Sequence, residues 1–359
     1  MRTTTLAATA VVGLSVLALA ACSTSTATGD DARTISIVGF AVPEAANKNI
    51  QAEFAKTEAG KGVEFSTSYG ASGDQSRAVV GGLKADYVHL SVASDVDRLV
   101  DAGLVDESWD DGPNQGIVST SVVVLGVREG NPKGIEGWDD LARPGIGIVT
   151  ANPASSGAAR WNALAAWGHI TENGGTEEEA TRFLEDIFAN VVSLAGSGRD
   201  ATQAFLGGTG DVLIAYENEA ILAAQNGQGF DYVIPEMTLL IENPGAVLAD
   251  AAPVASEWLD FVLGPEGQKQ FALTGFRPVN PANPGVVDYG ALGISPEDVK
   301  GAPDPSDPFP AVTHLLTLEK NFGGPGWDGI KDKLFGDGKD GAPVGIVTAA
   351  IAASGKAAS

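Results

Sequence analysis

The sequence predicts a two-lobed α/β protein with parallel-rich sheets and a ligand cleft between the lobes. Three observations support this fold class. First, short apolar or β-branched runs alternate with stretches of helical periodicity along most of the chain, as in parallel strands joined by helices. Second, three of the helical stretches begin with Ser-Gly directly after a predicted strand. Third, 359 residues are enough for two hydrophobic cores.

The Ser-Gly helix starts are the most informative feature of the sequence. A helix start leaves about four backbone N–H groups without partners and carries roughly half a unit of positive charge, so it favours an oxyanion. Small residues let the anion approach these N–H groups, and a Ser hydroxyl adds a neutral donor. One such Ser is equally explained as a helix cap, so the hypothesis depends on all three. The starts lie at Ser72-Gly73, Ser156-Gly157 and Ser197-Gly198.

The composition excludes several partners. The formal net charge is -24, with 46 acidic against 22 basic residues, which disfavours nucleic acid and anionic lipid surfaces. The same charge repels a small anion at long range. However, salt screens surface charges beyond about 8 Å, whereas buried N–H dipoles act at contact distance.

The N-terminus is typical of a secretory signal. Arg2 precedes an apolar stretch from about Leu6 to Ala21, which is shorter than the ~20 residues of a transmembrane helix. Residues 1–21 are therefore predicted to be a lipoprotein signal peptide. Cys22, the single cysteine, follows small residues as in the lipobox of bacterial lipoproteins, which implies acylation of its thiol by a fatty acid such as palmitate. The alternative is an ordinary signal peptide with an incidental cysteine.

The rest of the chain divides into segments that return between two lobes. In the first lobe we predict strands at 34–40, 63–68 and 85–91, and in the second at 145–149, 191–194 and 211–216. A capping box predicts a helix from Thr176. No element is predicted beyond residue 335. The expected divisions are 22–33 for a lipidated tether, 34–120 and 238–277 for lobe 1, 121–237 and 310–345 for lobe 2, and 278–309 for a Pro/Gly-rich connection.

Five stretches resemble the sulfate-binding proteins of bacterial ABC transporters. This family has the type II periplasmic-binding-protein fold. The resemblance covers about residues 34–335 and implies an extracytoplasmic, lipid-anchored monomer that delivers sulfate or thiosulfate to permease subunits for sulfur assimilation. The stretches are YGASGDQSRAVVGGLKAD (69–86), REGNPKGIEGWDDLARPG (128–145), NPASSGAARWNALAAWG (152–168), GTGDVLIAYENEA (208–220) and NFGG (321–324).

The resemblance also implies which residues hold the anion. In this family the dehydrated sulfate is bound by neutral donors only, with no metal or other cofactor. Arg199 is implied as support behind the site, without direct contact. By similarity the donors are Ala41, Ser72, Ser156, Gly157, Ala158, Gly198 and Tyr216.

Four of these positions depart from the family pattern. Ala41 replaces an Asp, Ala158 a second Gly, Gly198 an Ala that is often found, and Tyr216 a Trp. The Tyr216 phenol still donates a hydrogen bond, but its oxygen lies elsewhere than an indole nitrogen and it also accepts. The preference between sulfate and thiosulfate therefore stays open.

The residues themselves also favour a fully ionised anion. Sulfate carries no proton at neutral pH, so its site needs donors and no acceptor, whereas hydrogen phosphate needs an acceptor. Asp74 and Asp200 are candidates for that acceptor. We interpret both as first-turn residues that favour the helix dipole without touching a ligand. Arg160 is expected to lie on a helix surface.

Two other classes of function fit the residues less well. A serine hydrolase would need a nucleophile elbow, and Ser72 is followed at once by Gly73, where the G-x-S-x-G motif places its second Gly one residue later. The three histidines, His89, His169 and His314, are scattered, and no spacing suggests zinc. A structural or adhesive lipoprotein would not require three convergent helix starts. The sequence therefore predicts a binding protein that is not an enzyme.

Overall fold

The computed structural model describes residues 33–324, 327, 329–339 and 341–356. The predicted signal peptide, Cys22 and nearly all of the predicted tether lie outside the described residues. Within the described part of the chain, no helix is long and apolar enough to cross a membrane.

Most of the described strands lie in one continuous sheet, ordered β2-β1-β3-β9-β4-β7-β5-β6, with β10 paired to β9 and β8 to β4. The first half of this sheet, β2-β1-β3, is parallel, and so is the second half, β7-β5-β6. The strand bounds are β1 (Thr34–Phe40), β2 (Glu64–Gly70), β3 (Tyr87–His89), β4 (Ile117–Val127), β5 (Ile148–Ala151), β6 (Val191–Ala195), β7 (Val212–Tyr216), β8 (Asp231–Val233), β9 (Met237–Val247) and β10 (His314–Leu316).

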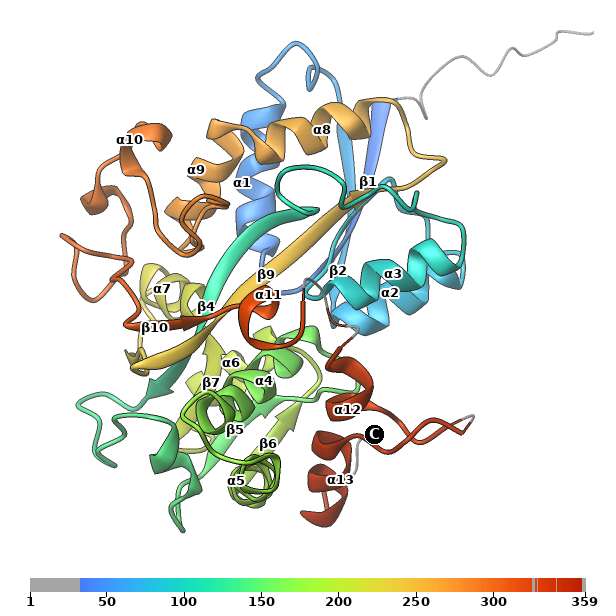
Figure 1. Cartoon of the computed structure of the whole chain (residues 1–359). Helices are drawn as coiled ribbons and strands as arrows, with labels where there is room; N and C mark the ends of the chain where they lie inside the picture. Colours follow the sequence, from blue (N-terminus) through green and yellow to red (C-terminus); the bar gives the residue numbers. More distant parts are fainter. Residues whose placement is uncertain (1–32, 325–326, 328, 340, 357–359) are drawn as a thin grey trace, which may run out of the picture.

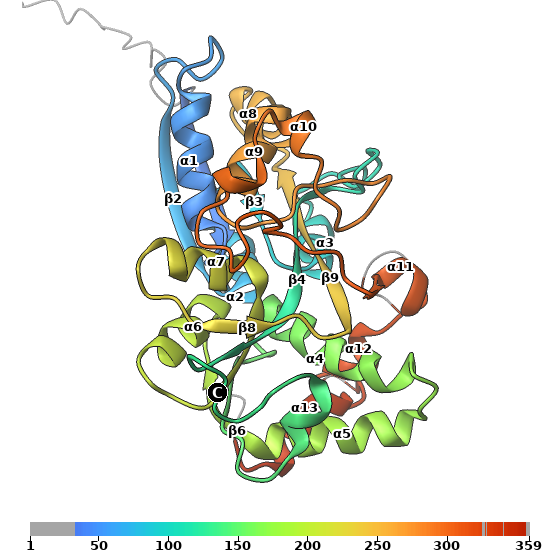
Figure 2. The ribbon, with the colours of Figure 1, turned by 90° about the vertical axis from the view of Figure 1, so that its left-hand side faces the viewer.

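Two long antiparallel strands, β4 and β9, join the two halves. One end of β9 pairs with β3, while β4 pairs with β7 and β8 at its other end. Figure 1 shows both strands running from the upper part of the molecule to the lower part. Figure 2 shows β4 extending from the upper part, which carries α1, α8 and α9, into the lower part. The prediction of a mixed α/β fold with parallel-rich sheets is confirmed.

Helices follow the strands as the sequence predicts. Thr176 caps α5 with the predicted capping box, because its Oγ1 accepts from the Glu179 N–H at 3.2 Å while its own N–H donates to Glu179 Oε2 at 2.7 Å. The bounds are α1 (Glu44–Phe54), α2 (Ser72–Val80), α3 (Ala93–Asp101), η2 (Trp138–Ala142), α4 (Gly157–Thr171), α5 (Glu177–Asn190), α6 (Gly198–Leu206), α7 (Glu217–Gln225), α8 (Val254–Leu263), α9 (Pro265–Leu273), α10 (Tyr289–Leu292), η3 (Pro296–Asp298), α11 (Leu318–Asn321), α12 (Lys331–Phe335) and α13 (Ile346–Ala353).

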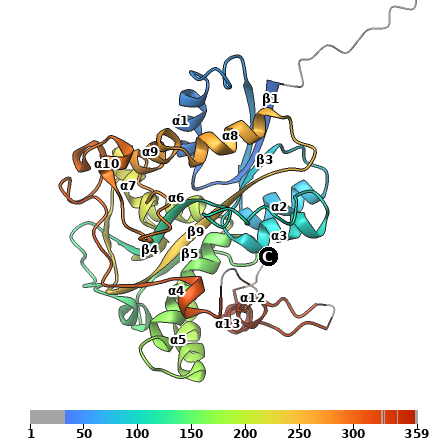
Figure 3. The same cartoon turned by 45° about the horizontal axis from the view of Figure 1, so that its top comes forward.

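The central helix α4 is buried on nearly every side, from Gly157 to Gly168 with the exception of Arg160. Its Ala- and Trp-rich sequence explains this, because a helix that is apolar all round must be covered on all faces. The C-terminal helices α12 and α13 lie below α2 and α3 in Figures 1 and 3, and α13 packs against α5. Sequence reasoning assigned no element to α13.

His89, at the end of β3, is completely buried and lies between Asn47 and Ser119, with ring nitrogens 3.3 Å from Asn47 Oδ1 and 3.1 Å from Ser119 Oγ. Burial lowers the pKa of His89 from 6.5 to about 3, so the folded protein holds this imidazole neutral. Its stabilising contribution is therefore complete above pH 6.5, where unfolded His is also neutral, and is lost as the pH falls towards 3.

We expect His89 to make the protein less stable in weak acid. Between pH 7 and pH 5 the unfolded state takes up a proton that the folded state refuses, which corresponds to about 2 kcal/mol for this one residue. Urea unfolding of the wild type and of His89→Gln at pH 7 and at pH 5 measures this loss of stability. The free energy of unfolding of the variant should fall by about 2 kcal/mol less than that of the wild type over this range. Equal losses would contradict the burial argument.

Candidate anion-binding site

Four helix starts meet at one place between the two halves of the sheet. The Gly73 N–H, in the first turn of α2, donates to the Ser155 carbonyl just before α4 at 2.9 Å. A Cβ atom at Gly198, the first residue of α6, would lie 3.1 Å from Cβ of Ala158 in α4 and 3.2 Å from Cγ2 of Val42, just before α1. The Ser-Gly starts predicted from the sequence therefore converge, together with the start of α1.

Ser91, just beyond the end of β3, lies at the centre of this arrangement. Its N–H donates to Ser72 Oγ at 2.9 Å, and its Oγ lies 2.8 Å from the hydroxyl oxygen of Tyr216 at the end of β7. Its carbonyl accepts from Trp161 Nε1 at 2.7 Å. A Cβ atom at Gly157 would lie only 2.7 Å from Ser91 Cβ, so only glycine allows this close approach. Sequence reasoning missed Ser91, although its place beyond the carboxyl end of a parallel strand is a known position for ligand-binding residues.

The start of α4 offers unused donors. The Ser156 hydroxyl does not cap the helix. The N–H groups of Gly157, Ala158 and Gly198 make no hydrogen bond to any of the described residues. Ser197 differs, because its Oγ accepts from the Asp200 N–H at 3.1 Å and donates to Asp200 Oδ2 at 2.7 Å. The alternative explanation, a serine that only caps its helix, therefore holds at Ser197 and fails at Ser156.

Two of the predicted donors already have partners. Ser72 Oγ donates to Asp95 Oδ2 at 2.6 Å, and the Ala41 N–H donates to the Gly70 carbonyl at 2.9 Å. Both would have to exchange these partners to bind an anion. Asp95, which sequence reasoning also missed, is fully buried in α3.

Tyr216 and Ser91 share a hydrogen-bond network that leaves one hydrogen unused. Tyr216 is 1% exposed, and its hydroxyl oxygen accepts from Asn243 Nδ2 at 3.3 Å. Burial raises the pKa of Tyr216, so the phenol keeps its proton. The two hydroxyls bring two hydrogens, and their mutual bond uses one. Whichever oxygen donates, the other hydroxyl retains a hydrogen for a further acceptor.

The charged groups nearby are engaged with the protein. Arg199 donates to both carboxylate oxygens of the buried Glu219 and, at 3.0 Å, to the Val42 carbonyl. It therefore joins the starts of α6 and α1. Asp74 pairs with Arg77 in the first turn of α2, and Asp200 forms the cap of α6 described above. Both aspartates lie in the first turns of their helices, as predicted.

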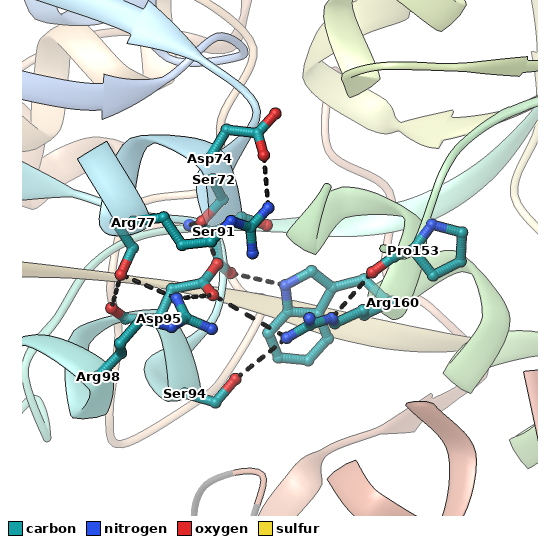
Figure 4. A network of polar contacts seen from close by, with 11 residues as sticks. Ser72, Asp74, Arg77, Ser91, Ser94, Asp95, Arg98, Pro153 and Arg160 are labelled. Carbon is teal, nitrogen blue, oxygen red and sulfur yellow. Dashed lines mark hydrogen bonds and ion pairs between the residues drawn. The ribbon is translucent and has the colours of Figure 1, made fainter. Parts of the chain in front are cut away.

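Arg160 corrects an expectation. It was expected on a helix surface, but its side chain is only 12% exposed and lies 4.0 Å from Asp95 Oδ1. It also donates to the Pro153 carbonyl at 3.2 Å. Figure 4 shows Arg160, Arg98 and Ser72 directed towards Asp95 from different sides. The loop before α4 and the start of α3 cover this side chain, a tertiary contact that helical spacing does not reveal.

The chain is similar to several known binding proteins. It is 40% identical over 352 residues to the sulfate-binding protein of Synechococcus elongatus, which covers 94% of this chain and 95% of that protein. It is 35% identical to the thiosulfate-binding protein of Pseudomonas aeruginosa, over 79% and 82% of the two chains. The solved structure of the sulfate-binding protein SubI from Mycobacterium tuberculosis matches with a TM-score of 0.75 and 40% identity, covering 84% of this chain and 99% of that one.

These relatives decide between binding and catalysis. They are sulfate- and thiosulfate-binding proteins, so the prediction that the chain is not an enzyme is confirmed, and the hydrolase alternative is set aside. The site agrees with this, since the partners of the Ser72 hydroxyl are Asp95 and the Ser91 N–H. Residues 35–277 match the family of bacterial extracellular solute-binding proteins, and the chain belongs to this extracytoplasmic family.

Proposed function

We propose that this chain captures sulfate between two lobes and delivers it to an ABC permease for import. The observation that carries the proposal is the convergence of the α1, α2, α4 and α6 starts with unused N–H groups at Gly157, Ala158 and Gly198. Helix starts from both halves of the sheet then surround one dianion. The names of the relatives, sulfate-binding and thiosulfate-binding, support this ligand class.

The donors act without charge. In our proposal, the Ser156 hydroxyl and the three N–H groups bind the sulfate oxygens, and the Ser91–Tyr216 pair supplies the hydrogen left over from its mutual bond. Ser72 and the N–H of Ala41 also bind the sulfate, after giving up their hydrogen bonds to Asp95 and to the Gly70 carbonyl. Such an array stabilises a dehydrated dianion because oriented dipoles in a site without water act at contact distance.

We propose that the same array disfavours phosphate. Hydrogen phosphate brings a proton that needs an acceptor. The groups proposed to contact the anion are backbone N–H groups and hydroxyls that all donate to it. A protonated anion would therefore leave its own hydrogen unpaired, which is unfavourable in a buried site.

Lobe closure and membrane attachment complete the proposal. Residues 34–120 and 238–277 form lobe 1, residues 121–237 and 310–345 form lobe 2, and residues 278–309 connect them. The long strands β4 and β9 are the natural hinge, because they run through both sheet halves. We propose that the monomer is anchored by a lipid on Cys22.

Thiosulfate is the second candidate ligand. It shares the charge and shape of sulfate, but one oxygen is replaced by sulfur, a weaker acceptor. Tyr216 is the residue that favours thiosulfate as a candidate. Its hydroxyl pair with Ser91 presents a single hydrogen, and the direction of this hydrogen adapts to the acceptor.

Competition calorimetry of the soluble form, beginning at residue 23, tests the proposal. We expect one sulfate per chain, competition by thiosulfate, and none by phosphate. Ser156→Ala should weaken sulfate binding by about 1 to 2 kcal/mol, or roughly 5- to 30-fold, through the lost donor. The matched control is Ser256→Ala, which removes an exposed serine hydroxyl of α8 and should leave the affinity within about twofold. An unchanged affinity in Ser156→Ala would contradict this donor set.

A further inference from the structure

A basic pocket lies beside the helix starts in an otherwise acidic protein. Its volume is about 670 Å³. Five cationic side chains line it, against two carboxylates, Asp332 and Asp337. The whole chain has a formal charge of -24, so this concentration of positive charge is an exception. The cations are Arg77, Arg98, Arg160, Lys331 and Lys339.

The pocket is built from the elements that form the anion site. Arg77 belongs to α2 and Arg98 to α3, on one side, while residues 152–154 and Arg160 belong to the start of α4 on the other. Lys331 begins α12, which closes a further side. The bond from the Gly73 N–H to the Ser155 carbonyl lies at the junction of these walls, and Arg77 Nη1 is 3.3 Å from the Cβ position of Gly73.

Carboxylates neutralise only part of this charge. Asp74 pairs with Arg77, and Asp95 pairs with Arg98 at 3.0 Å and more weakly with Arg160, as Figure 4 shows. Lys339 lies 3.3 Å from Asp337. Lys331 has no ion-pair partner among the described residues, and it is half-buried. With Asp74 and Asp95 included, the cations still exceed the carboxylates.

Burial and like charge both act on Arg160. Burial lowers its pKa, and the charges of Arg98 and Arg77 add to this effect while Asp95 opposes it. The guanidinium groups of both sheet halves are therefore close enough to repel one another. An anion between them would relieve that repulsion.

We propose that this pocket is a vestibule that first captures the sulfate dianion from solution by opposite charge and then releases it into the neutral site between the helix starts. The inference rests on the proposed function. Repulsion by the acidic surface would otherwise slow the approach of sulfate, and a local excess of positive charge next to the site offsets it. In the neutral site itself, binding strength then depends on dipoles, and the vestibule governs the rate of association.

The test is stopped-flow fluorescence of the intact soluble protein mixed with sodium sulfate, which follows the tryptophans near the site. Lys331→Gln should lower the association rate constant by about three- to tenfold at low ionic strength, and Lys331→Glu by more. The dissociation rate constant should stay unchanged. Added sodium chloride should bring variants and wild type together, because at about 1 M salt the screening length is only ~3 Å.

Lys61→Gln is the matched control. Lys61 lies in the loop between α1 and β2, which Figure 1 shows at the far end of the upper part. Lys61→Gln removes the same single positive charge as Lys331→Gln. If Lys331→Gln and Lys61→Gln slow association equally, or if the change lies in the dissociation rate, the vestibule is refuted. A wild type that gives no binding signal in calorimetry would refute the proposed function itself, whereas sulfate binding with unaltered association in Lys331→Gln refutes only the vestibule.

Discussion

Replacing Gly157 by valine is expected to weaken sulfate binding about a hundredfold or more, equivalent to ~3 kcal/mol. The Cβ atom of any larger residue would lie 2.7 Å from Ser91 Cβ, 2.8 Å from Ser91 Oγ and 3.2 Å from Val92 Cγ1. Relief of these contacts must move the start of α4 away from the end of β3. The N–H groups of Gly157 and Ala158 would then no longer face the same point as the α6 start. Calorimetry with sulfate measures the loss.

A glycine without close neighbours provides the control. No heavy atom lies within 4 Å of a Cβ atom built at Gly112, among the residues that the structure describes, so Gly112→Val should bind sulfate as the wild type does. Thermal unfolding of both variants without ligand separates a loss of binding from a loss of folding. Wild-type affinity in Gly157→Val would show that the close contact between α4 and Ser91 is dispensable.

Replacing Arg277 by alanine is expected to lower the free energy of unfolding by about 3 to 5 kcal/mol. Arg277 is 1% exposed and binds the fully buried Glu217 through two hydrogen bonds of 2.7 and 2.9 Å. It also donates to the carbonyls of Gly285 and Pro310. Its removal leaves a carboxylate buried without a partner at the start of α7, directly after Tyr216. Urea unfolding at pH 7 measures the effect.

The double variant Arg277→Met, Glu217→Gln identifies the cause. If the penalty comes from an unpaired buried charge, removing both charges should recover at least half of the lost free energy. If the double variant is as unstable as Arg277→Ala, the loss of unfolding free energy comes instead from the packing of the 278–309 segment. A loss of less than about 1 kcal/mol in Arg277→Ala would contradict the importance of the pair.

Much of the fold was predictable because it depends on local patterns. The predicted strand at 34–40 has the bounds that the structure shows, and the helix predicted from Thr176 is α5, with Thr176 as its cap. Both predictions use residues next to each other in the sequence, an alternation of apolar residues and a capping box. The Ser-Gly starts were also predictable, since glycine after a strand lets the backbone turn and serine is common at helix starts.

The centre of the site was less predictable because it depends on contacts between distant strands. Ser91 and Tyr216 are 125 residues apart and meet only because β9 and β4 lie between the sheet halves that carry them. In the sequence, Ser91 is an ordinary small polar residue after a strand. Asp95 is likewise an ordinary acidic residue in the first turn of a helix, and only the packing of α3 against α2 shows that it accepts from Ser72.

The basic pocket was hidden for a similar reason. Its cations come from α2, α3, α4 and the segment after residue 330, and each of these segments has a formal net charge of +1 or less. Lys331, at the start of α12, and Lys339, between α12 and α13, join the pocket through tertiary packing that no periodicity near residue 335 indicates. A long-range arrangement of single charges is therefore a property of the folded chain alone.

A crystal structure of the soluble protein with sulfate provides the most direct test of binding by neutral donors. We expect one sulfate between the starts of α4 and α6, with oxygens about 2.7–3.1 Å from the N–H nitrogens of Gly157, Ala158 and Gly198 and from the Ser156 hydroxyl, and with no guanidinium or ammonium in contact. A sulfate bound only among Arg77, Arg160 and Lys331, with the helix starts unoccupied, would contradict it.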